Sequence, residues 1–355
     1  MLAGAVVLVA VLRAWPVPYY ALTPGDATPV APLVKIQGLP TNPHRDKIML
    51  TDVYLSTLTA WQWLIMHFES HVEFVSADQL VEPGIAPSEL LAQGFLQMFD
   101  SKQSAQVAAF RALGWTIPAT TTGAVVNGVV APSPAHGAKV HVADKIVGAN
   151  GRVVDTSCSL IDIVHVLRPG SLVHLNIERS HINARGDISY SKAVVVSLRT
   201  AVAPRALVGN GCAGLHGPDR SWIGVSLEDG WRYVLPGAIS INTSYIGGPS
   251  AGLAMSLTLI DELSSGSLTG HRTIAATGTI DARGHVGDVG GVAEKTVAVQ
   301  RAGATIFLVP RVEVATARAA AQPGLRILGV TTLQQALHDL HALGGVTPVS
   351  LATPH

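Results

Sequence analysis

The chain begins with an unbroken apolar run over residues 1–12, which ends at Arg13 and is followed by an aromatic cluster that starts at Trp15. A helix that crosses a membrane needs about 20 apolar residues. This run can cross only if Arg13 extends back to the membrane surface, or if the true start of the protein lies upstream. The basic leader and the small-x-small cleavage site of a secretory signal peptide are both missing. We therefore expect residues 1–22 to form an uncleaved transmembrane anchor.

The next segment, residues 23–114, opens with a proline-rich linker and then mixes strand-like and helix-like patterns. Residues 48–53 have the pattern of a strand, and residues 88–113 carry apolar positions at helical spacing. The sequence from His67 to His71 resembles the zinc motif His-Glu-x-x-His, but its glutamate stands at the centre and would face away from both histidines. We therefore assign no metal there and expect a partly buried helix face.

Between residues 115 and 200 the pattern changes to short strands separated by turn signals. A hairpin is expected at Asn150-Gly151, because that dipeptide favours the tight turns of hairpins. A helix is expected to stop at Pro169-Gly170. The elements expected here are strands at 125–130 and 172–177, a turn at 133–135, a hairpin over 143–154 and a helix over 160–167.

Residues 201–345 alternate between strands and helices, and residues 346–355 are expected to be a flexible tail. Gly291, Gly303 and Pro310 stand where helices and strands should begin or end. The expected strands are 223–226, 238–241, 305–309 and 325–330, and the expected helices are 252–263, 292–302, 312–321 and 332–343. A hairpin is expected over residues 272–280, with its turn at 281–284 and its return through Val286.

Composition narrows the function without choosing it. The 355 residues leave room for two or three domains, and 14% charged and 48% hydrophobic residues at a formal net charge of +0 indicate neither disorder nor nucleic-acid binding. Cys158 and Cys212 are too few for a disulfide framework or a zinc knuckle, although one bridge between them is possible outside the cytoplasm. The histidines show no metal-binding spacing, so no metal or cofactor is expected.

The strongest chemical signal is the sequence Gly247-Gly248-Pro249-Ser250-Ala251-Gly252, which follows an expected strand and opens an expected helix. Glycines allow a sharp turn, and proline suits the first helical position. Ser250 should therefore lie in the first helical turn, where free N–H groups and the helix dipole favour an oxyanion. Read alone, Ser250 could also be a helix-capping serine.

A serine hydroxyl needs a base to become a nucleophile, and Lys295 is the candidate. Its helix would begin at Gly290-Gly291, so the positive helix end and burial would both disfavour the charged amine. Glu294 is adjacent in sequence but does not share a helix face with Lys295, so no ion pair is implied. The alternative is an ordinary solvated lysine.

Three motifs in order resemble the proteolytic domain of Lon proteases, which are serine peptidases with a Ser/Lys dyad: Gly-Pro-Ser-Ala-Gly, then Thr277-Gly278 before a short hairpin, then Gly-Gly-x-x-Glu-Lys at residues 290–295. The resemblance covers residues 222–340. It implies that Ser250 is the nucleophile, that Lys295 is the general base and that Thr277 hydrogen-bonds the lysine. Gly247, Gly248, Pro249 and Ala251 would supply the backbone that surrounds the oxyanion and the substrate.

Residues 115–200 resemble a PDZ domain through Ser-Pro-Ala, Asp-Lys-Ile-Val and Asn-Gly-Arg-Val-Val. The resemblance implies capture of a peptide C-terminus by strand addition. Two places depart from the family: residues 120–123 stand where its Gly-Leu-Gly-Phe loop would be, and Ala143 stands where it has glycine. A spacer or a gate is therefore the alternative role.

As a whole, the chain resembles membrane-anchored bacterial PDZ and Lon-like proteases. The fold class implied is α+β, with an N-terminal membrane anchor, a PDZ-like β-rich domain and a C-terminal Lon-type proteolytic domain. We expect a single-pass protein of the bacterial cell membrane, with both folded domains outside the cytoplasm and a homo-oligomeric assembly. The sequence holds no Gly-x-x-x-x-Gly-Lys-[Ser/Thr] motif, so hydrolysis of unfolded or flexible polypeptides without ATP is expected.

Two alternatives stay open at this point. Gly248-Pro249-Ser250-Ala251-Gly252 also fits the Gly-x-Ser-x-Gly elbow of α/β-hydrolases, which would need Asp281 with His338 or His341. The other alternative is a membrane-tethered PDZ scaffold whose protease-like domain is inactive.

Overall fold

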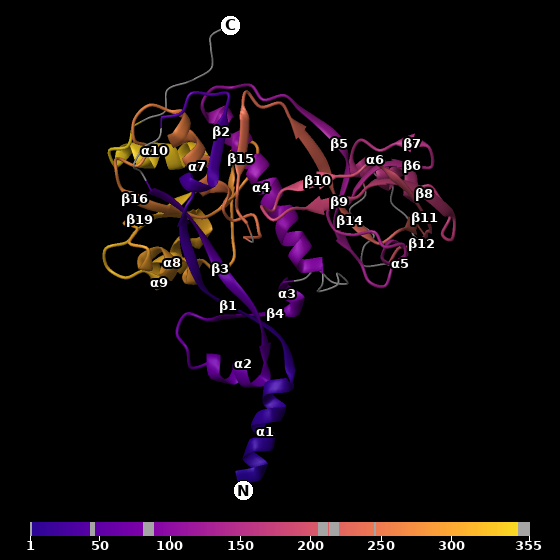
Figure 1. The fold of residues 1–355 in the computed structure, drawn as a ribbon, viewed down its shortest axis with the longest axis horizontal. Coiled ribbons are helices and arrows are strands. Elements are labelled where there is room, and N and C mark those ends of the chain that lie inside the picture. The colour runs from indigo at the N-terminus through magenta and orange to yellow at the C-terminus, as the bar shows by residue number, and fades with distance from the viewer. Residues whose placement is uncertain are drawn as a thin grey trace.

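The computed structural model describes residues 2–42, 47–80, 89–204, 212, 220–244 and 246–346. These residues form two β-sheet bodies that lie side by side, with a narrow N-terminal extension below them (Figure 1). The mixture of helices and strands agrees with the α+β fold expected from the sequence. The expected tail lies almost wholly outside the described residues.

The main sheet joins the two ends of the chain. Its strand order is β20-β19-β16-β3-β1-β4, with β3 parallel to β16 and antiparallel to β1. The strands are β1 (Pro16–Pro29), β3 (Lys47–Thr59), β4 (Glu73–Ser76), β16 (Thr273–Ala276), β19 (Ile306–Pro310) and β20 (Arg326–Val330). The N-terminal segment therefore shares one sheet with the C-terminal half, across the expected boundaries at 114 and 200. Where independently folding domains begin and end stays a prediction.

The centre of this sheet is covered on both faces, which explains its nearly continuous apolar strands. Alternate residues face opposite sides: Leu50 and Leu308 belong to one core, whereas Met49 and Phe307 belong to the other. The first core contains α4 (Leu90–Ala112), α7 (Gly252–Leu263) and α10 (Leu333–Ala342), and the second contains α8 (Val292–Arg301) and α9 (Val314–Ala320). Helices α7 and α8 thus approach the sheet from opposite faces.

The second sheet has the order β11-β8-β6-β5-β14, with β7 paired to β6. Its strands are β5 (Ala119–Val129), β6 (Lys145–Ala149), β7 (Arg152–Val153), β8 (Leu172–Glu178), β11 (Val194–Arg199) and β14 (Val225–Tyr233). The hairpin expected at Asn150-Gly151 is confirmed, since Ala149 pairs with Arg152. Residues 225–233 were expected to belong with the C-terminal half, but they pair along β5 instead.

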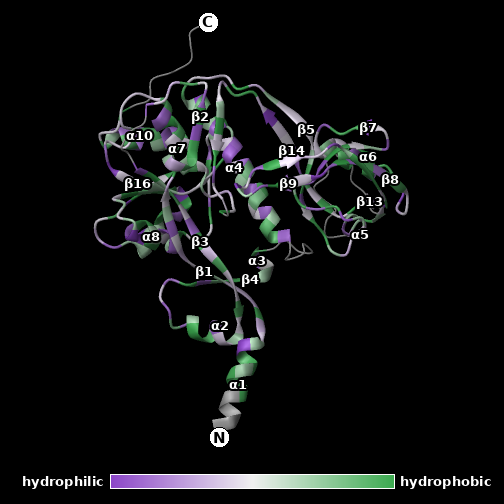
Figure 2. Cartoon of the chain, in the orientation of Figure 1, coloured by the Kyte–Doolittle hydropathy of each residue, from purple (hydrophilic) through white to green (hydrophobic). Residues whose placement is uncertain are grey.

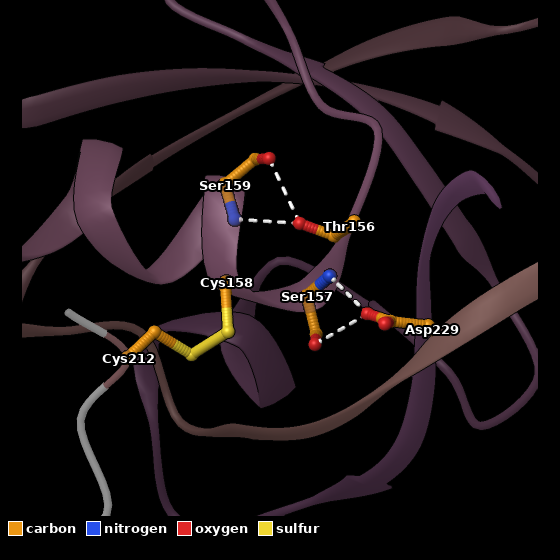
Figure 3. Close-up of a disulfide and its surroundings, with 6 residues drawn as sticks. All are labelled: Thr156, Ser157, Cys158, Ser159, Cys212 and Asp229. Atoms are coloured by element: carbon orange, nitrogen blue, oxygen red, sulfur yellow. Dashed lines mark hydrogen bonds between the residues drawn. A yellow bond between two sulfur atoms is a disulfide. The ribbon is translucent and has the colours of Figure 1, made fainter.

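One helix of the second body is held by polar contacts and a disulfide (Figure 3). Helix α6 (Ser157–His165) is capped by Thr156, whose hydroxyl accepts the Ser159 N–H at 3.1 Å. Ser157 donates both its N–H and its hydroxyl proton to Asp229 of β14, at 2.8 and 2.6 Å. Cys158 forms a disulfide with Cys212, so the single bridge left open by the sequence is present.

The remaining elements lie outside the two large sheets, and all of them except α1 are short. They are α1 (Leu2–Ala14), η1 (Ala31–Leu33), β2 (Val34–Gln37), α2 (Ala60–Met66), α3 (Ala77–Leu80), α5 (Pro134–Gly137), β9 (Ser180–Ile182), β10 (Ile188–Tyr190), β12 (Ala201–Val202), β13 (Ser221–Trp222), β15 (Ala238–Ile241), β17 (Thr279–Ile280), β18 (Val286–Gly287) and η5 (Arg311–Glu313). Strand β15 pairs with β2. The chain therefore pairs with the N-terminal segment again after it leaves the second body.

The expected transmembrane anchor is wrong. Helix α1 has 13 residues, and its described part is largely hydrophobic (Figure 2), but the chain continues after it as strand β1 rather than as more helix. Within the residues that the structure describes, no helix is both long enough and apolar enough to cross a membrane. This finding contradicts a single-pass anchor over residues 1–22 and the placement in the bacterial cell membrane that rested on it.

Two local expectations are also corrected. Helix α2 ends at Met66, so the segment from His67 to His71 is a turn instead of a helix face; the His67 ring stacks on Phe74 with ring centroids 4.4 Å apart. The expected hairpin over residues 272–280 is divided, because β16 joins the main sheet and only β17 pairs with β18. The break falls at Thr277-Gly278, where Gly278 has a φ of 150°.

Candidate active site

Ser250 lies in the turn that leads into α7, beside the end of β16. Its carbonyl oxygen accepts the Gly278 N–H at 2.9 Å, and the Leu253 N–H in turn donates to the Gly278 carbonyl at 3.1 Å. Helix α7 begins at Gly252, so Ser250 and Pro249 precede the first helical turn, in which the sequence placed them. The difference is within the usual spread of helix boundaries, and the backbone at Ser250 is fixed by Gly278 instead.

The two glycines before Pro249 allow close contact with another helix. The Gly248 N–H donates to the Gly94 carbonyl of α4 at 2.8 Å, and Gly248 has a φ of 86°, which side chains disfavour. A Cβ atom on Gly247 would lie 3.3 Å from the Gly94 carbonyl carbon. In the structure these glycines fix the loop against α4, and their expected role in approach to the substrate stays a prediction.

Lys295 lies in the first turns of α8 and is buried. The helix starts after Gly291, which has a φ of 67°, and the Lys295 N–H donates to the Gly291 carbonyl at 2.9 Å. Only 3% of Lys295 is exposed. Burial lowers the pKa of the Lys295 amine to about 8, while the carboxyl groups of Asp52, Glu313 and Glu294 act in the opposite direction. A useful fraction of this amine is therefore neutral near pH 7 to 8.

Thr277 connects Lys295 to the Ser250 turn. This buried residue follows β16 directly, and its backbone N–H donates to the Leu308 carbonyl at 2.9 Å. Its hydroxyl donates to the Ser250 carbonyl oxygen at 3.3 Å, and the Lys295 Nζ donates to that hydroxyl oxygen at 3.5 Å. The structure therefore brings together the three residues that the sequence placed far apart.

Ser250 and Lys295 share a pocket of about 280 Å³. One wall is the turn before α7, and the other is strand β3. The lining residues are Thr51, Asp52, Val53, Tyr54, Ile246, Gly247, Ser250, Ala251 and Lys295. A larger cavity of about 540 Å³ lies between α9 and β20, but its lining includes neither Ser250 nor Lys295. The chemistry of the lining, and not the size of the cavity, identifies the candidate site.

The donors available to an oxyanion differ from those expected. The resemblance implied that the backbone of Gly247, Gly248, Pro249 and Ala251 surrounds the oxyanion, but the Gly248 N–H is bonded to Gly94, and Pro249 has none. Among the described residues, the N–H groups of Ser250 and Ala251 form no hydrogen bond. These two groups at the entrance to α7 are free to bind an oxygen that develops negative charge.

The residues that an α/β-hydrolase mechanism would need lie away from Ser250. Asp281 accepts a hydrogen bond from His285 at 2.8 Å, His338 is exposed beside Asp339, and the His341 ring lies 3.0 Å from the Gly345 carbonyl. None of these side chains, all within the described part of the chain, lines the pocket that contains Ser250. No Ser-His-Asp arrangement is formed there.

Sequence reasoning missed the contribution of β3. Thr51 and Asp52 line the pocket, although the sequence identified residues 48–53 only as a strand. Thr51 is 1% exposed, and its hydroxyl has no hydrogen-bond partner among the described residues. The only available signal was a polar pair after an apolar run, and that pattern also occurs at ordinary strand ends.

In the second body, Ala143 shows why glycine is usual at its position. Its φ is 69°, the left-handed region that residues with a side chain seldom adopt. The Ala143 N–H donates to the Val126 carbonyl at 2.8 Å, and the next residue, Asp144, is buried and paired with Arg179. These contacts hold the strained turn in place.

Comparison with known families identifies two domains. Residues 242–341 match the Lon protease (S16) C-terminal proteolytic domain, and residues 111–189 match the PDZ domain. The chain thus contains a proteolytic domain of the Lon serine-peptidase family and a PDZ domain. The first match includes Ser250, Thr277 and Lys295, but Asp52 lies outside it.

Similar proteins include Lon proteases of several bacteria. The Lon protease of Rickettsia conorii is 36% identical over 106 residues, which are 29% of this chain and 13% of the relative. The Lon protease of Clostridioides difficile is 48% identical over 64 residues, covering 18% of this chain and 8% of the relative. The chain therefore matches only a small part of the length of these relatives.

Among solved structures, the PDZ domain of an SdrC-like protein from Listeria monocytogenes is similar. The identity is 21%, the match covers 30% of this chain and 87% of that chain, and the TM-score is 0.22.

Proposed function

We propose that this chain, which contains the proteolytic domain of Lon serine peptidases beside a PDZ domain, is an endopeptidase that uses Ser250 as nucleophile and Lys295 as general base. The observation that carries the proposal is the environment of Lys295. Its amine is buried, has a pKa lowered to about 8, opens onto the same pocket as Ser250 and is linked to the Ser250 turn through Thr277.

The first half of the reaction forms an acyl-enzyme. The neutral Lys295 amine takes the proton of the Ser250 hydroxyl as Oγ bonds to the carbonyl carbon of the substrate. The resulting oxyanion accepts hydrogen bonds from the free N–H groups of Ser250 and Ala251. The Lys295 ammonium then protonates the leaving amine as the peptide C–N bond breaks. Ser250 is left as an ester.

The second half restores the enzyme. Lys295 takes a proton from water as the water oxygen attacks the ester carbon, and it returns that proton to the Ser250 oxygen when the ester bond breaks. The described residues show no direct hydrogen bond between Ser250 and Lys295, and catalytic hydrogen bonds often tighten only when a substrate is bound. Thr277 limits the movement needed, because it holds the amine near the turn.

The proposed substrates are unfolded or flexible polypeptides, which this chain would hydrolyse without ATP. The support is the pocket of about 280 Å³ and the absence of a phosphate-binding Gly-x-x-x-x-Gly-Lys motif from the 355 residues. We propose in addition that the PDZ domain binds extended peptide segments and that the chain assembles as a homo-oligomer. The first proposal rests on the resemblance to PDZ domains, and the second rests on the resemblance to PDZ and Lon-like proteases.

Degradation of casein without ATP tests the proposal, using the full chain and its Ser250→Ala and Lys295→Ala variants. Lys192→Ala is the matched control, because Lys192 is exposed and lies in the second body. We expect activity in the wild type and in Lys192→Ala, and none in the other two. Activity that survives Lys295→Ala would exclude the dyad, and a folded wild type without activity would favour the inactive scaffold.

A further inference from the structure

Among the described residues that line the Ser250 pocket, Asp52 is the one that carries a carboxyl group. It reaches this place from β3, a strand that belongs to the N-terminal segment of the chain. The start of α8 packs on the same strand: a Cβ atom on Gly291 would lie 2.9 Å from Val53 Cγ1. Asp52 and Lys295 are therefore held on two elements that touch.

A β-bulge places the Asp52 carboxyl group. In the pairing of β1 with β3, Pro24 faces Val53 and Ala27 faces Thr51, so Gly25 and Asp26 together oppose Asp52 alone. Such a two-against-one arrangement bends a strand and redirects a side chain, and it is frequent beside active sites.

The bulge also binds the carboxylate. The Asp26 N–H donates to Asp52 Oδ1 at 2.7 Å. A Cβ atom on Gly25 would lie 2.0 Å from that same oxygen, so only glycine leaves room for it. The Asp26 carboxylate is itself held, because the Tyr54 hydroxyl donates to Asp26 Oδ2 at 2.6 Å. The position of Asp52 is thus built into both strands.

We propose that Asp52 is a positioning residue that keeps a negative charge beside the Lys295 amine and so sets the pH range in which that amine can accept a proton. The inference rests on the proposed role of Lys295 as the base. Asp52 does not contact the reacting bond; it acts through the lysine.

The charges around both groups agree with this role. Lys295 faces carboxyl groups on three elements: Asp52 on β3, Glu313 on η5 and Glu294 on α8 itself. Asp52 gives the largest of these three effects, all of which raise the pKa of Lys295 against the effect of burial. Around Asp52 stand Asp26 of β1 and Lys295. Burial and the charge of the Asp26 carboxylate raise the Asp52 pKa, the Asp26 N–H and Lys295 lower it, and the net shift is upward from 3.8. Without the Asp52 charge, burial would lower the pKa of Lys295 further.

The test is the pH dependence of kcat/KM for a fluorogenic peptide, measured with the full chain. In Asp52→Asn the rise of activity with pH should move to lower pH by about one unit, because a neutral neighbour no longer favours the ammonium form. Asp52→Glu keeps the charge and should stay near the wild-type profile. Asp339→Asn, which changes a partly exposed carboxylate on α10 outside the pocket, should leave the profile unmoved. An unmoved profile in a folded, active Asp52→Asn enzyme would overturn the inference.

A second readout does not need activity. The pH dependence of Lys295 acetylation by acetic anhydride can be followed by mass spectrometry in the Ser250→Ala background, with and without Asp52→Asn. We expect the midpoint to fall with Asp52→Asn; an equal midpoint would reject the inference even if the chain proved not to be a peptidase. If Asp52→Asn does not fold, Asp52→Ser provides a second neutral variant for the same comparison.

Discussion

The Lys295 amine and the Thr277 hydroxyl lie 3.5 Å apart at the C-terminal end of β16, in the interior of the protein. The same hydroxyl donates to the Ser250 carbonyl oxygen at 3.3 Å. Because α7 and α8 approach the sheet from opposite faces, their starts meet only where β16 ends, and Thr277 is the residue at that point. The relationship makes Thr277 a link between Lys295, the proposed base, and the turn that carries Ser250, the proposed nucleophile.

Replacing Thr277 by valine should therefore lower kcat by roughly 10- to 100-fold, since loss of one buried hydrogen-bonding group costs about 1–3 kcal/mol. Valine has the same shape but no hydroxyl, so the fold should persist. The measurement is peptide cleavage together with thermal melting. Thr277→Ser, which keeps the hydroxyl, should retain most activity. Full activity in Thr277→Val would show that the link is dispensable.

The lowered pKa of Lys295 predicts how activity responds to pH. The neutral amine is the reactive form, so kcat/KM should rise as pH increases and should level off above a pKa of about 8. Initial rates of peptide cleavage between pH 6 and pH 10 would show this inflection. A profile that is flat through this range, or one that falls above pH 7, would argue against a lysine base.

Gly248→Ala probes the loop that precedes Ser250, the proposed nucleophile. Gly248 has a φ of 86°, and no atom lies within 4 Å of the place where its Cβ would stand, so the cost is conformational and amounts to about 1–2 kcal/mol. The loop should shift and activity should fall more than global stability does. Comparing kcat/KM with the melting temperature tests this. Gly303→Ala is the matched control, with a φ of 75° and equally open surroundings far from the pocket; it should lose stability and keep activity.

A carboxyl pair at the junction of the two bodies should make stability depend on pH. Asp100 of α4 is hydrogen-bonded to Glu228 of β14, and burial followed by repulsion from Glu228 raises the Asp100 pKa to about 8. The pKa of Glu228 is also raised by burial. The folded state therefore binds a proton that the unfolded chain releases near pH 4, and the stability that this proton provides is lost as pH rises from about 4 towards 8.

Asp100→Asn removes this titration. Its melting temperature should decline less than that of the wild type between pH 5.5 and pH 8, by a difference on the order of 2 °C. Asp339→Asn should behave as the wild type does. Equal slopes in Asp100→Asn and the wild type would mean that the pair does not share a proton.

The elements of the C-terminal half could be predicted well from the sequence, because their signals are local. The helix expected over residues 252–263 is found at Gly252–Leu263, and the glycines and prolines at element ends stand where they were expected. Ser250, Lys295 and Thr277 could be proposed as site residues because three motifs occur in order; in the structure Ser250 and Lys295 line one pocket, and Thr277 is hydrogen-bonded to both residues.

What the sequence could not predict depends on long-range pairing. No local pattern shows that β3 would pair with β16, so Thr51 and Asp52 could not be placed in the pocket. The apolar start of the chain suggested a membrane anchor, because hydropathy alone does not show that the helix would end at Ala14 and continue as a paired strand. The hydrogen bond from the Gly248 N–H to Gly94 depends on how α4 packs, which no local pattern shows.

The central claim, that Lys295 activates Ser250, is tested most directly by covalent labelling. A fluorophosphonate reacts with an activated serine, and peptide mapping by mass spectrometry locates the adduct. The account predicts an adduct on Ser250 in the wild type and in Lys192→Ala, with more than about tenfold slower labelling in Lys295→Ala. Labelling of Ser250 at the wild-type rate in Lys295→Ala, or labelling of a different serine in the wild type, would contradict it.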